Sequence, residues 1–368
     1  MKEIILGFIT SFFVVLLATP SLIKVAKMKH LVDEPSEDRK HHTTSKPTIG
    51  GIIIFAASIF AYALWFPWDN MAYFGSPIDF KESVKEFKFF IAAAILIFFI
   101  GVKDDIIGVA PVKKLVSHII VGFILVLMAD IRIYGLHGVF GADLMPYEAS
   151  VILSVFTYIV VVNAFNLIDG SDGLAAGVGF IASCFFGIWF YSTSQLPLSL
   201  LSFILAGSLL AFLVFNFSPA KIFMGDSGSL FIGALTFVLA VKCIQTDTAV
   251  VPQMIEGLSA PVYAMAVLAY PLIDTLRVFT LRILKGLSPF VADRKHIHHK
   301  LIDRGFSHAQ TAIILYVVCL LVPVISMFFG GVNPTLTFFG MFVISFVVVN
   351  AVFLLPAKRS KKTLAGAK

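Results

Sequence analysis

Eleven long apolar segments constrain the fold of this chain more than any other feature of its sequence. A helix needs about 20 apolar residues to cross the hydrocarbon of a bilayer, and it satisfies its own backbone hydrogen bonds there. The 368-residue chain is 58% hydrophobic and 14% charged, too apolar for a water-soluble globule of this size. We therefore predict an all-α, polytopic transmembrane bundle of 10–11 helices that forms a single domain, 1–368. The apolar segments are residues 3–23, 48–66, 87–103, 114–131, 149–166, 173–193, 196–216, 228–245, 259–283, 309–330 and 334–356.

Lysine and arginine residues concentrate on one predicted side of the membrane. With the N-terminus outside, 22 of the 28 fall on the cytoplasmic side and 6 on the other. Because cytoplasmic loops are enriched in positive charge, we predict an N-out, C-in topology. The first segment resembles a signal peptide, but Lys24, Lys27 and Lys29 follow it and favour a retained helix. The predicted cytoplasmic stretches are loops 24–47, 104–113, 167–172, 217–227 and 284–308 and a basic tail, 357–368.

Net charge and cysteine usage exclude two other classes of protein. The charge of +6 belongs to the same cytoplasmic loops, so nucleic acid is not expected as a partner. The three cysteines lie in or beside apolar segments, without CxxC or histidine-paired spacing. This placement indicates buried thiols rather than a disulfide scaffold or a zinc cluster.

Acidic, amide and imidazole side chains gather on the predicted cytoplasmic side. The topology was derived from Lys and Arg alone, so this agreement is independent of it. Because non-adjacent loops bring these groups to one membrane face, we predict a single site there. The residues are Asp104, Asp105, Asn163, Asn166, Asp169, Asp172, Asp226, His296, His298 and His299.

The segment NAFNLIDGSDGLAAG, 163–177, ends one apolar helix and begins the next. Asn163, Asn166 and Asp169 are three residues apart and share one helical face, and Asp172 follows in the turn. Carboxylates in this position can hold Mg²⁺ or another hard cation through oxygen ligands. The alternative is that Asp172 only caps the following helix.

Asp226 lies in KIFMGDSGSLFIG, 221–233, among glycine and serine residues that let backbone N–H groups approach an anion. It is a candidate metal ligand, with a simple turn and cap as the alternative. Asp104 and Asp105 are adjacent and cannot point the same way along a helix. We expect one to bind metal or take a proton and the other to pair with a lysine such as Lys103 or Lys114, unless both form a solvated acidic helix end.

Basic residues surround the three histidines of ADRKHIHHKLIDRG, 292–305. This composition favours binding of a multiply charged anion, with lipid headgroup contact or zinc binding as alternatives. The first loop, 33–51, carries Arg39, Lys40, His41 and His42, for which headgroup contact is the simple explanation. Asp274 and Arg277 lie one turn apart within an apolar segment, where charges usually pair or line a cavity.

Four motifs in order resemble those of the polyprenyl-phosphate N-acetylhexosamine-1-phosphate transferase superfamily, glycosyltransferase family 4. They are the Asp104–Asp105 pair, NAFNLIDGSDGLAAG, FMGDSGSLFIG and HIHH, and the resemblance runs from the Asp33 loop to about Gln310. The first loop, with Arg39, Lys40 and His42 before Pro47, Gly50 and Gly51, looks like the branch that uses UDP-N-acetylglucosamine. HIHH, rather than an unbroken HHH, sets the chain apart from the phospho-MurNAc-pentapeptide translocase branch.

The resemblance implies roles for individual residues. The implied catalytic residues are Asp104, Asp105, Asp169 and Asp226, and the implied metal ligands are Asp226, Asp169, Asp172 and Asp105. Lys114 matches the family lysine that follows the acidic pair, and the adjacent Lys113 is the alternative candidate for this lysine. The implied substrate-binding residues are Lys114, Asn163, Asn166, Asp172, Arg294, His296, His298, His299, Arg39 and His42.

The resemblance also implies the reaction. N-acetylhexosamine 1-phosphate, by default N-acetylglucosamine 1-phosphate, would pass from a UDP-sugar to undecaprenyl phosphate, with UMP released and Mg²⁺ or Mn²⁺ as cofactor. Direct attack by the lipid phosphate is favoured over a covalent phospho-aspartyl intermediate on Asp104 or Asp105. The enzyme would lie in a bacterial inner membrane with a cytoplasmic active site and start O-antigen, common antigen or teichoic acid synthesis. A homodimer is left open.

Three rival functions fit the sequence less well. A phospho-MurNAc-pentapeptide transferase is the alternative within the superfamily. A secondary transporter would show repeated halves and polar groups near the membrane midplane, and neither is visible. A CDP-alcohol phosphotransferase would need an Ala-Arg pair after its first Asp-Gly and further spaced aspartates, which residues 169–177 lack.

Overall fold

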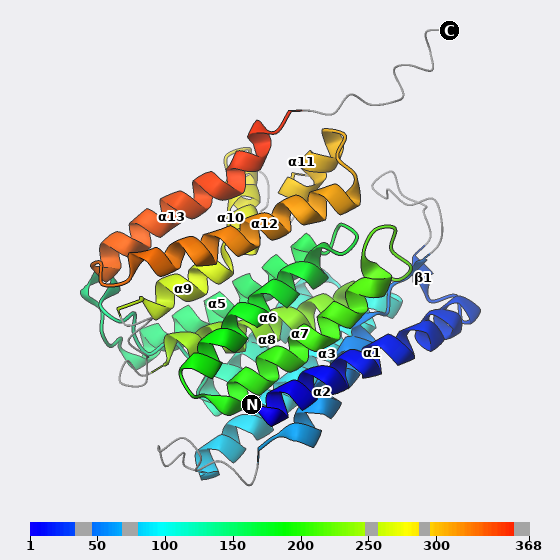
Figure 1. Ribbon diagram of the computed structural model, residues 1–368, viewed down its shortest axis with the longest axis horizontal. Coiled ribbons are helices and arrows are strands. Elements are labelled where there is room, and N and C mark those ends of the chain that lie inside the picture. Colours follow the sequence, from blue (N-terminus) through cyan, green and yellow to red (C-terminus); the bar gives the residue numbers. More distant parts are fainter. Residues whose placement is uncertain (34–45, 68–79, 247–256, 287–294, 357–368) are drawn as a thin grey trace.

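The computed structural model describes residues 1–33, 46–67, 80–246, 257–286 and 295–356, and they form a bundle of helices (Figure 1). The predicted site residues Arg39, His42 and Arg294 and the tail 357–368 lie outside this part of the chain. The α-helices are α1 (Lys2–Met28), α2 (Gly51–Trp65), α3 (Phe80–Ile107), α4 (Pro111–Phe123), α5 (Tyr147–Ile168), α6 (Leu174–Ser192), α7 (Leu196–Asn216), α8 (Gly225–Ile244), α9 (Ala260–Val267), α10 (Ala269–Ile283), α11 (Ile297–Asp303), α12 (His308–Ser326) and α13 (Pro334–Ala351). The π-helix η2 (Ile124–Met128) continues α4, and η3 (Val139–Gly141), η6 (Met327–Phe329) and η7 (Val352–Leu354) are short 3₁₀ turns.

Every predicted apolar segment coincides with helix, which confirms the all-α, multi-pass fold class. Within the described residues, eight helices are long and apolar enough to cross a membrane, and α9 with α10 would make a ninth span. The count of 10–11 spans and the N-out orientation stay predictions.

The segment 259–283, predicted as one helix, is bent by 73° where α9 ends and α10 begins. Pro271 lies three residues after the break at Leu268. Its ring nitrogen has no hydrogen to donate to the carbonyl one turn earlier, so the helical ladder is interrupted there.

Several predicted loops are partly helical. The stretch 104–113 contains the end of α3 and the start of α4, and 284–308 contains α11. Apolar runs end before helices do, because charged side chains in a last turn can reach water while the backbone stays helical. Asp104 and Asp105 are thus the fourth and third residues from the end of α3, inside the helix.

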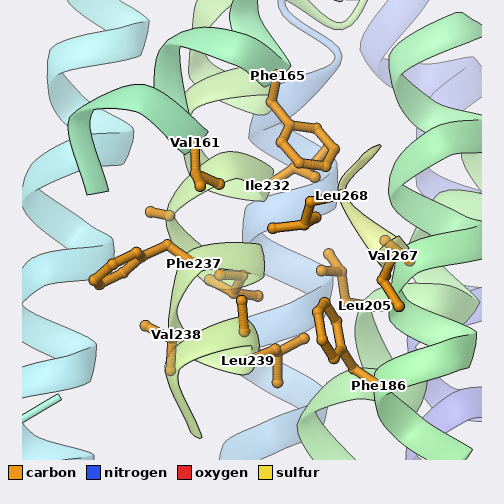
Figure 2. Close-up of a cluster of buried hydrophobic side chains, with 14 of the residues drawn as sticks. Val161, Phe165, Phe186, Leu205, Ile232, Phe237, Val238, Leu239, Val267 and Leu268 are labelled. Carbon is orange, nitrogen blue, oxygen red and sulfur yellow. The ribbon is translucent and has the colours of Figure 1, made fainter. Parts of the chain in front are cut away.

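Helix α8 is the central element of the bundle. Its side chains are buried almost all round, which explains why its sequence is apolar on every face. In Figure 2, Ile232 of α8 lies beside Phe165 of α5, while Phe237 of α8 points to the side away from Phe186 of α6 and Leu205 of α7. The N-terminus of α8 is therefore held in the middle of one end of the bundle.

The helices on the outside expose apolar side chains, as expected for surfaces that face lipid. Phe13 and Leu17 of α1, Phe156 of α5 and Phe346 of α13 are examples. On its other side α1 packs closely on α7, where Gly207 lets the α1 backbone approach: a Cβ there would lie 2.5 Å from the Phe8 carbonyl oxygen. Such close contact between small residues is a usual way for helices to associate in membranes.

A two-stranded ribbon, β1 (Val32–Asp33) with β2 (Lys46–Pro47), brings the first loop back to the bundle. The Pro47 carbonyl accepts from the Phe223 backbone N–H at 2.7 Å, and the Gly51 N–H donates to the Met224 carbonyl at 2.8 Å. These bonds dock the start of α2 on the connection that leads into α8. In Figure 1, β1 and α11 lie at the same end of the bundle, opposite the N-terminus.

Substitution of Gly51 tests this junction. A Cβ at Gly51 would lie 2.0 Å from the backbone nitrogen of Gly228, which cannot move without shifting α8. We expect Gly51→Ala to cost about 1–3 kcal/mol or more and to lower the melting temperature of the purified protein in detergent. Gly340→Ala, at a helical glycine with nothing within 4 Å of its Cβ position, is the matched control. Equal melting temperatures for the two variants would contradict this account of the junction.

Candidate active site

Four helices bring polar side chains together at the N-terminus of α8. The ammonium of Lys114, on α4, donates to Asp104 Oδ2 of α3 at 2.8 Å and also to Asp226 Oδ2 of α8. The amide of Asn166, on α5, donates to Asp226 Oδ1 at 2.8 Å and to the Ser229 hydroxyl at 3.0 Å. We call Asp104, Lys114, Asn166 and Asp226 the carboxylate–lysine cluster.

The two adjacent aspartates of α3 have different partners, as predicted. Asp104 pairs with Lys114 and also accepts from the Val109 backbone N–H at 2.7 Å, which closes the α3–α4 turn. Asp105 accepts from the backbone N–H groups of Asp226 and Ser227 at 2.6 and 3.0 Å. Asp105 therefore caps the N-terminus of α8 from another helix and fixes the position of the Asp226 backbone.

A glycine makes this cap possible. Gly225 has φ +73°, a left-handed conformation that side chains other than glycine rarely adopt. A Cβ there would also lie 2.7 Å from both carboxylate oxygens of Asp105.

The α5–α6 turn lies against the same helix end. The Gly225 backbone N–H donates to the Asp169 carboxyl, whose pKa is raised well above its ordinary value by desolvation and by the negative charges of Asp226 and Asp105. Within this group of side chains, carboxylates outnumber ammonium groups. The local excess of negative charge favours binding of a cation.

Asp172 does not cap α6, so that alternative is wrong. The N-cap of α6 is Gly173, without a side-chain hydrogen bond to the helix. Asp172 Oδ2 instead accepts from the Ala220 backbone N–H at 3.0 Å and lies 3.9 Å from Lys46 Nζ. Asp172 thus ties the α5–α6 turn to the connection between α7 and α8.

The histidine motif reaches this turn through α11. His298 is fully buried, and a Cβ built on Gly170 would lie 2.6 Å from its Nε2 atom. Burial and the neighbouring imidazoles of His299 and His296 lower the pKa of His298 well below its ordinary value, so this ring is neutral. His298 consequently packs on Gly170, the residue after Asp169, without adding positive charge.

Asn163 is separated from the other polar residues of its helix face. Its amide donates to the Ile159 carbonyl of the preceding turn at 2.7 Å. It lines an apolar groove of about 400 Å³ between α5, α9, α10 and α13, whose other walls include Phe156, Ala266, Phe279 and Phe342. Asn166, one turn further along α5, belongs to the carboxylate–lysine cluster, so Asn163 marks the part of the groove that lies one helical turn from a residue of the cluster.

Sequence reasoning missed several residues of the site. Lys46 lies over the Phe223 ring, 4.9 Å from its centroid, as well as near Asp172. Asn216 accepts from the Gly173 N–H at 3.1 Å and donates to the Ile222 carbonyl at 2.9 Å. In the sequence, Lys46 contributes only to the positive charge of a cytoplasmic loop. Asn216 is a single polar residue at the end of an apolar helix, and no local pattern indicates its contacts. Lys114, rather than the exposed Lys113, is the lysine that reaches the aspartates.

The metal ligands named from the sequence stay a prediction. Across the described ranges, no three His, Cys, Asp or Glu side chains are grouped so as to hold a metal ion. The carboxylates nevertheless have the oxygen chemistry and the uncompensated negative charge that suit a hard divalent cation.

Comparison with known proteins identifies the family. The sequence profile of Glycosyl transferase family 4 matches residues 87–244, which hold the aspartates of α3, of the α5–α6 turn and of α8. An undecaprenyl-phosphate alpha-N-acetylglucosaminyl 1-phosphate transferase of Yersinia pestis is 29% identical over 86% of this chain and 80% of its own length. A probable undecaprenyl-phosphate N-acetylglucosaminyl 1-phosphate transferase of Bacillus subtilis is 30% identical, over 86% and 82%. A decaprenyl-phosphate N-acetylglucosaminephosphotransferase of Mycobacterium tuberculosis is 31% identical, over 86% and 80%. With relatives of this identity over four-fifths of their length, and with the family's motifs gathered at one end of the bundle, the chain belongs to glycosyl transferase family 4, in the branch that these relatives represent.

Proposed function

We propose that this enzyme transfers N-acetylglucosamine 1-phosphate from UDP-N-acetylglucosamine to undecaprenyl phosphate and releases UMP. The observation that carries the proposal is the carboxylate–lysine cluster, built from four helices at one end of an apolar bundle. The names of the relatives support the polyprenyl phosphate acceptor and the sugar. They do not favour the phospho-MurNAc-pentapeptide transferase or the transporter. The product would start synthesis of a surface polysaccharide on the cytoplasmic face of a bacterial inner membrane.

The apolar groove is the proposed seat of the acceptor's prenyl chain. Its walls are almost entirely apolar, and they include Asn163, which lies one helical turn before Asn166 on α5. A prenyl chain in this groove would leave its phosphate near the carboxylate–lysine cluster.

Both substrates are anionic and repel each other. At 4 Å two unit charges at an effective dielectric constant near 20 cost roughly 4 kcal/mol. Lys114 offsets part of this repulsion, and we propose Mg²⁺, with Mn²⁺ as a substitute, for the remainder. Asp169 and Asp226 would hold the ion, which when bound stabilises the charge that develops on the leaving UMP. Asp105 and Asp172 are engaged by backbone N–H groups and are proposed to position the loops.

The proposed reaction is a direct displacement. An oxygen of undecaprenyl phosphate attacks the phosphorus that carries the sugar, and the bond from that phosphorus to the UMP oxygen breaks. The acceptor oxygen is already ionised at neutral pH, so no side chain is needed to remove a proton. Asp104 is held by Lys114 and Val109, which supports a positioning role over a covalent phospho-aspartyl one.

An assay with purified protein tests the function and the cofactor. Undecaprenyl phosphate, Mg²⁺ and a panel of UDP-sugars are supplied, and UMP release is measured. We expect release only with both substrates, fastest with UDP-N-acetylglucosamine, abolished by EDTA and restored by Mg²⁺. Shorter prenyl phosphates should show a higher KM if the groove holds the chain.

Three outcomes would overturn parts of the proposal. No UMP with any UDP-sugar would contradict the transferase, and activity unchanged by EDTA would contradict the metal. Exchange of labelled UMP into the UDP-sugar without acceptor would favour the covalent route.

A further inference from the structure

A buried carboxylate on α10 holds the first histidine of HIHH. Asp274 is fully buried, and its Oδ2 atom lies 3.0 Å from His296 Nδ1. Its Oδ1 atom accepts from the Ile297 backbone N–H at 2.9 Å. One side chain therefore fixes both the imidazole and the first turn of α11.

Arg277, one turn further along α10, secures the same segment. Its Nη1 atom donates to the Lys295 carbonyl at 2.9 Å and lies 3.6 Å from Asp274 Oδ1. Arg277 therefore holds the residue before His296 and places a positive charge beside the carboxylate that His296 contacts.

The carboxylate decides which nitrogen of His296 carries the proton. A carboxylate only accepts hydrogen bonds, so in the neutral imidazole Nδ1 is the protonated nitrogen and Nε2 keeps a free lone pair. His296 is 3% exposed, and its Nε2 atom has no hydrogen-bond partner among the described residues. A buried acceptor without a partner is costly, which points to a ligand that supplies a donor.

His296 borders the site already described. Its ring is stacked on that of His298, with centroids 5.8 Å apart and planes 17° apart, and His298 packs on Gly170 beside Asp169. A ligand bound at the carboxylate–lysine cluster and the α5–α6 turn is therefore the nearest candidate partner for Nε2.

We propose that Asp274 is a positioning residue that holds His296 in its Nδ1–H form, so that Nε2 accepts a hydrogen bond from a hydroxyl or amide N–H of the donor's sugar. Ionised phosphate oxygens only accept hydrogen bonds and cannot serve as this partner. His296 thus recognises the sugar rather than the phosphates of the donor. This inference rests on the proposed function for the identity of the ligand but not for the tautomer.

Asp274→Asn reverses the polarity of the contact while keeping its shape. The amide oxygen can still accept from the Ile297 N–H, but the amide NH₂ then donates to His296 Nδ1 and drives the proton to Nε2. Nitrogen NMR of ¹⁵N-histidine-labelled protein in detergent reports which ring nitrogen is protonated, and His296→Asn identifies the signal. We expect Nδ1–H in the wild type and Nε2–H in the variant. The Nδ1–H form in both proteins would overturn the proposal, whether or not transferase activity is found.

Kinetics test the sugar contact. We expect Asp274→Asn to lower kcat/KM for the UDP-sugar about 10- to 100-fold and to leave KM for undecaprenyl phosphate unchanged. A set of UDP-sugar analogues, each lacking one hydroxyl or the acetamido N–H, identifies the group that His296 contacts. On the analogue that lacks this group, the wild type and the variant should have nearly equal kcat/KM, because neither protein can make the contact. A constant ratio across all analogues would overturn the proposal. Thr280→Val is the control, because among the described residues the exposed Thr280 hydroxyl bonds only to the Leu276 carbonyl of its own helix.

His296→Asn provides a second route if Asp274→Asn does not fold. The shorter amide keeps a donor near the Nδ1 position for Asp274 and removes the Nε2 acceptor. We expect the same loss of kcat/KM for the UDP-sugar. We also expect the variant to match the wild type on the same analogue. Wild-type kinetics for this variant would overturn the proposal.

Discussion

Asp226→Asn is expected to reduce sugar-phosphate transfer by roughly 1,000-fold or more. Asp226 accepts from both Lys114 and Asn166, and its own backbone N–H is held by Asp105. The change keeps the size of the side chain but removes the negative charge toward which Lys114 and Asn166 donate their hydrogen bonds. It also removes one of the two carboxylates proposed for Mg²⁺. The measurement is UMP release at saturating UDP-N-acetylglucosamine and undecaprenyl phosphate.

Asp143→Asn is the matched control, because Asp143 is an exposed aspartate in the 142–146 loop, outside the site. Both variants should elute and melt like the wild type in detergent, since Asp105 still caps α8. If the Asp226 variant kept more than about a tenth of the wild-type kcat, the central role of this carboxylate would be refuted.

Lys114→Met should give the second largest loss, about 100-fold in kcat. Lys114 bridges Asp104 and Asp226, and its removal leaves the two carboxylates facing each other. The uncompensated negative charge of these carboxylates would also oppose the approach of two anionic substrates. A methionine keeps most of the length and apolar character of the lysine stem, so packing along α4 is preserved.

Lys113→Met separates charge from position. Lys113 is the preceding residue and is exposed, and it carries the same charge. We expect this variant to keep wild-type kcat within about twofold, because an exposed charge is screened by solvent and salt. Similar losses for the two lysine variants would show that α4 supplies only a diffuse positive field.

The arrangement of α10 and α11 shows how far pattern reasoning extends. Asp274 and Arg277 were expected to pair or line a cavity because charges are costly inside an apolar segment. They do lie close together, but their main partners are His296 and the Lys295 carbonyl. Spacing along a helix identified the neighbour one turn away, whereas the partner 22 residues ahead depends on how α11 folds back onto α10.

Asp172 shows the same limit in a turn. Its position before a helix is typical of a cap, yet its carboxylate binds Ala220 in a different connection, 48 residues away. A local pattern cannot reveal that α7 ends beside this turn and presents a free N–H there.

The sequence by itself determined the class of fold and predicted most of the polar residues that gather at one end of the bundle. Apolar length favours helices in lipid, since a helix satisfies its own backbone hydrogen bonds there, and most charged side chains lie at or beyond the ends of those helices. Only the tertiary structure decided which end residues meet. Lys114 reaches Asp226, 112 residues away, because α8 is buried in the centre of the bundle and α3, α4 and α5 surround its N-terminus. That packing arises from side-chain shapes along the whole of these helices, which no single motif records.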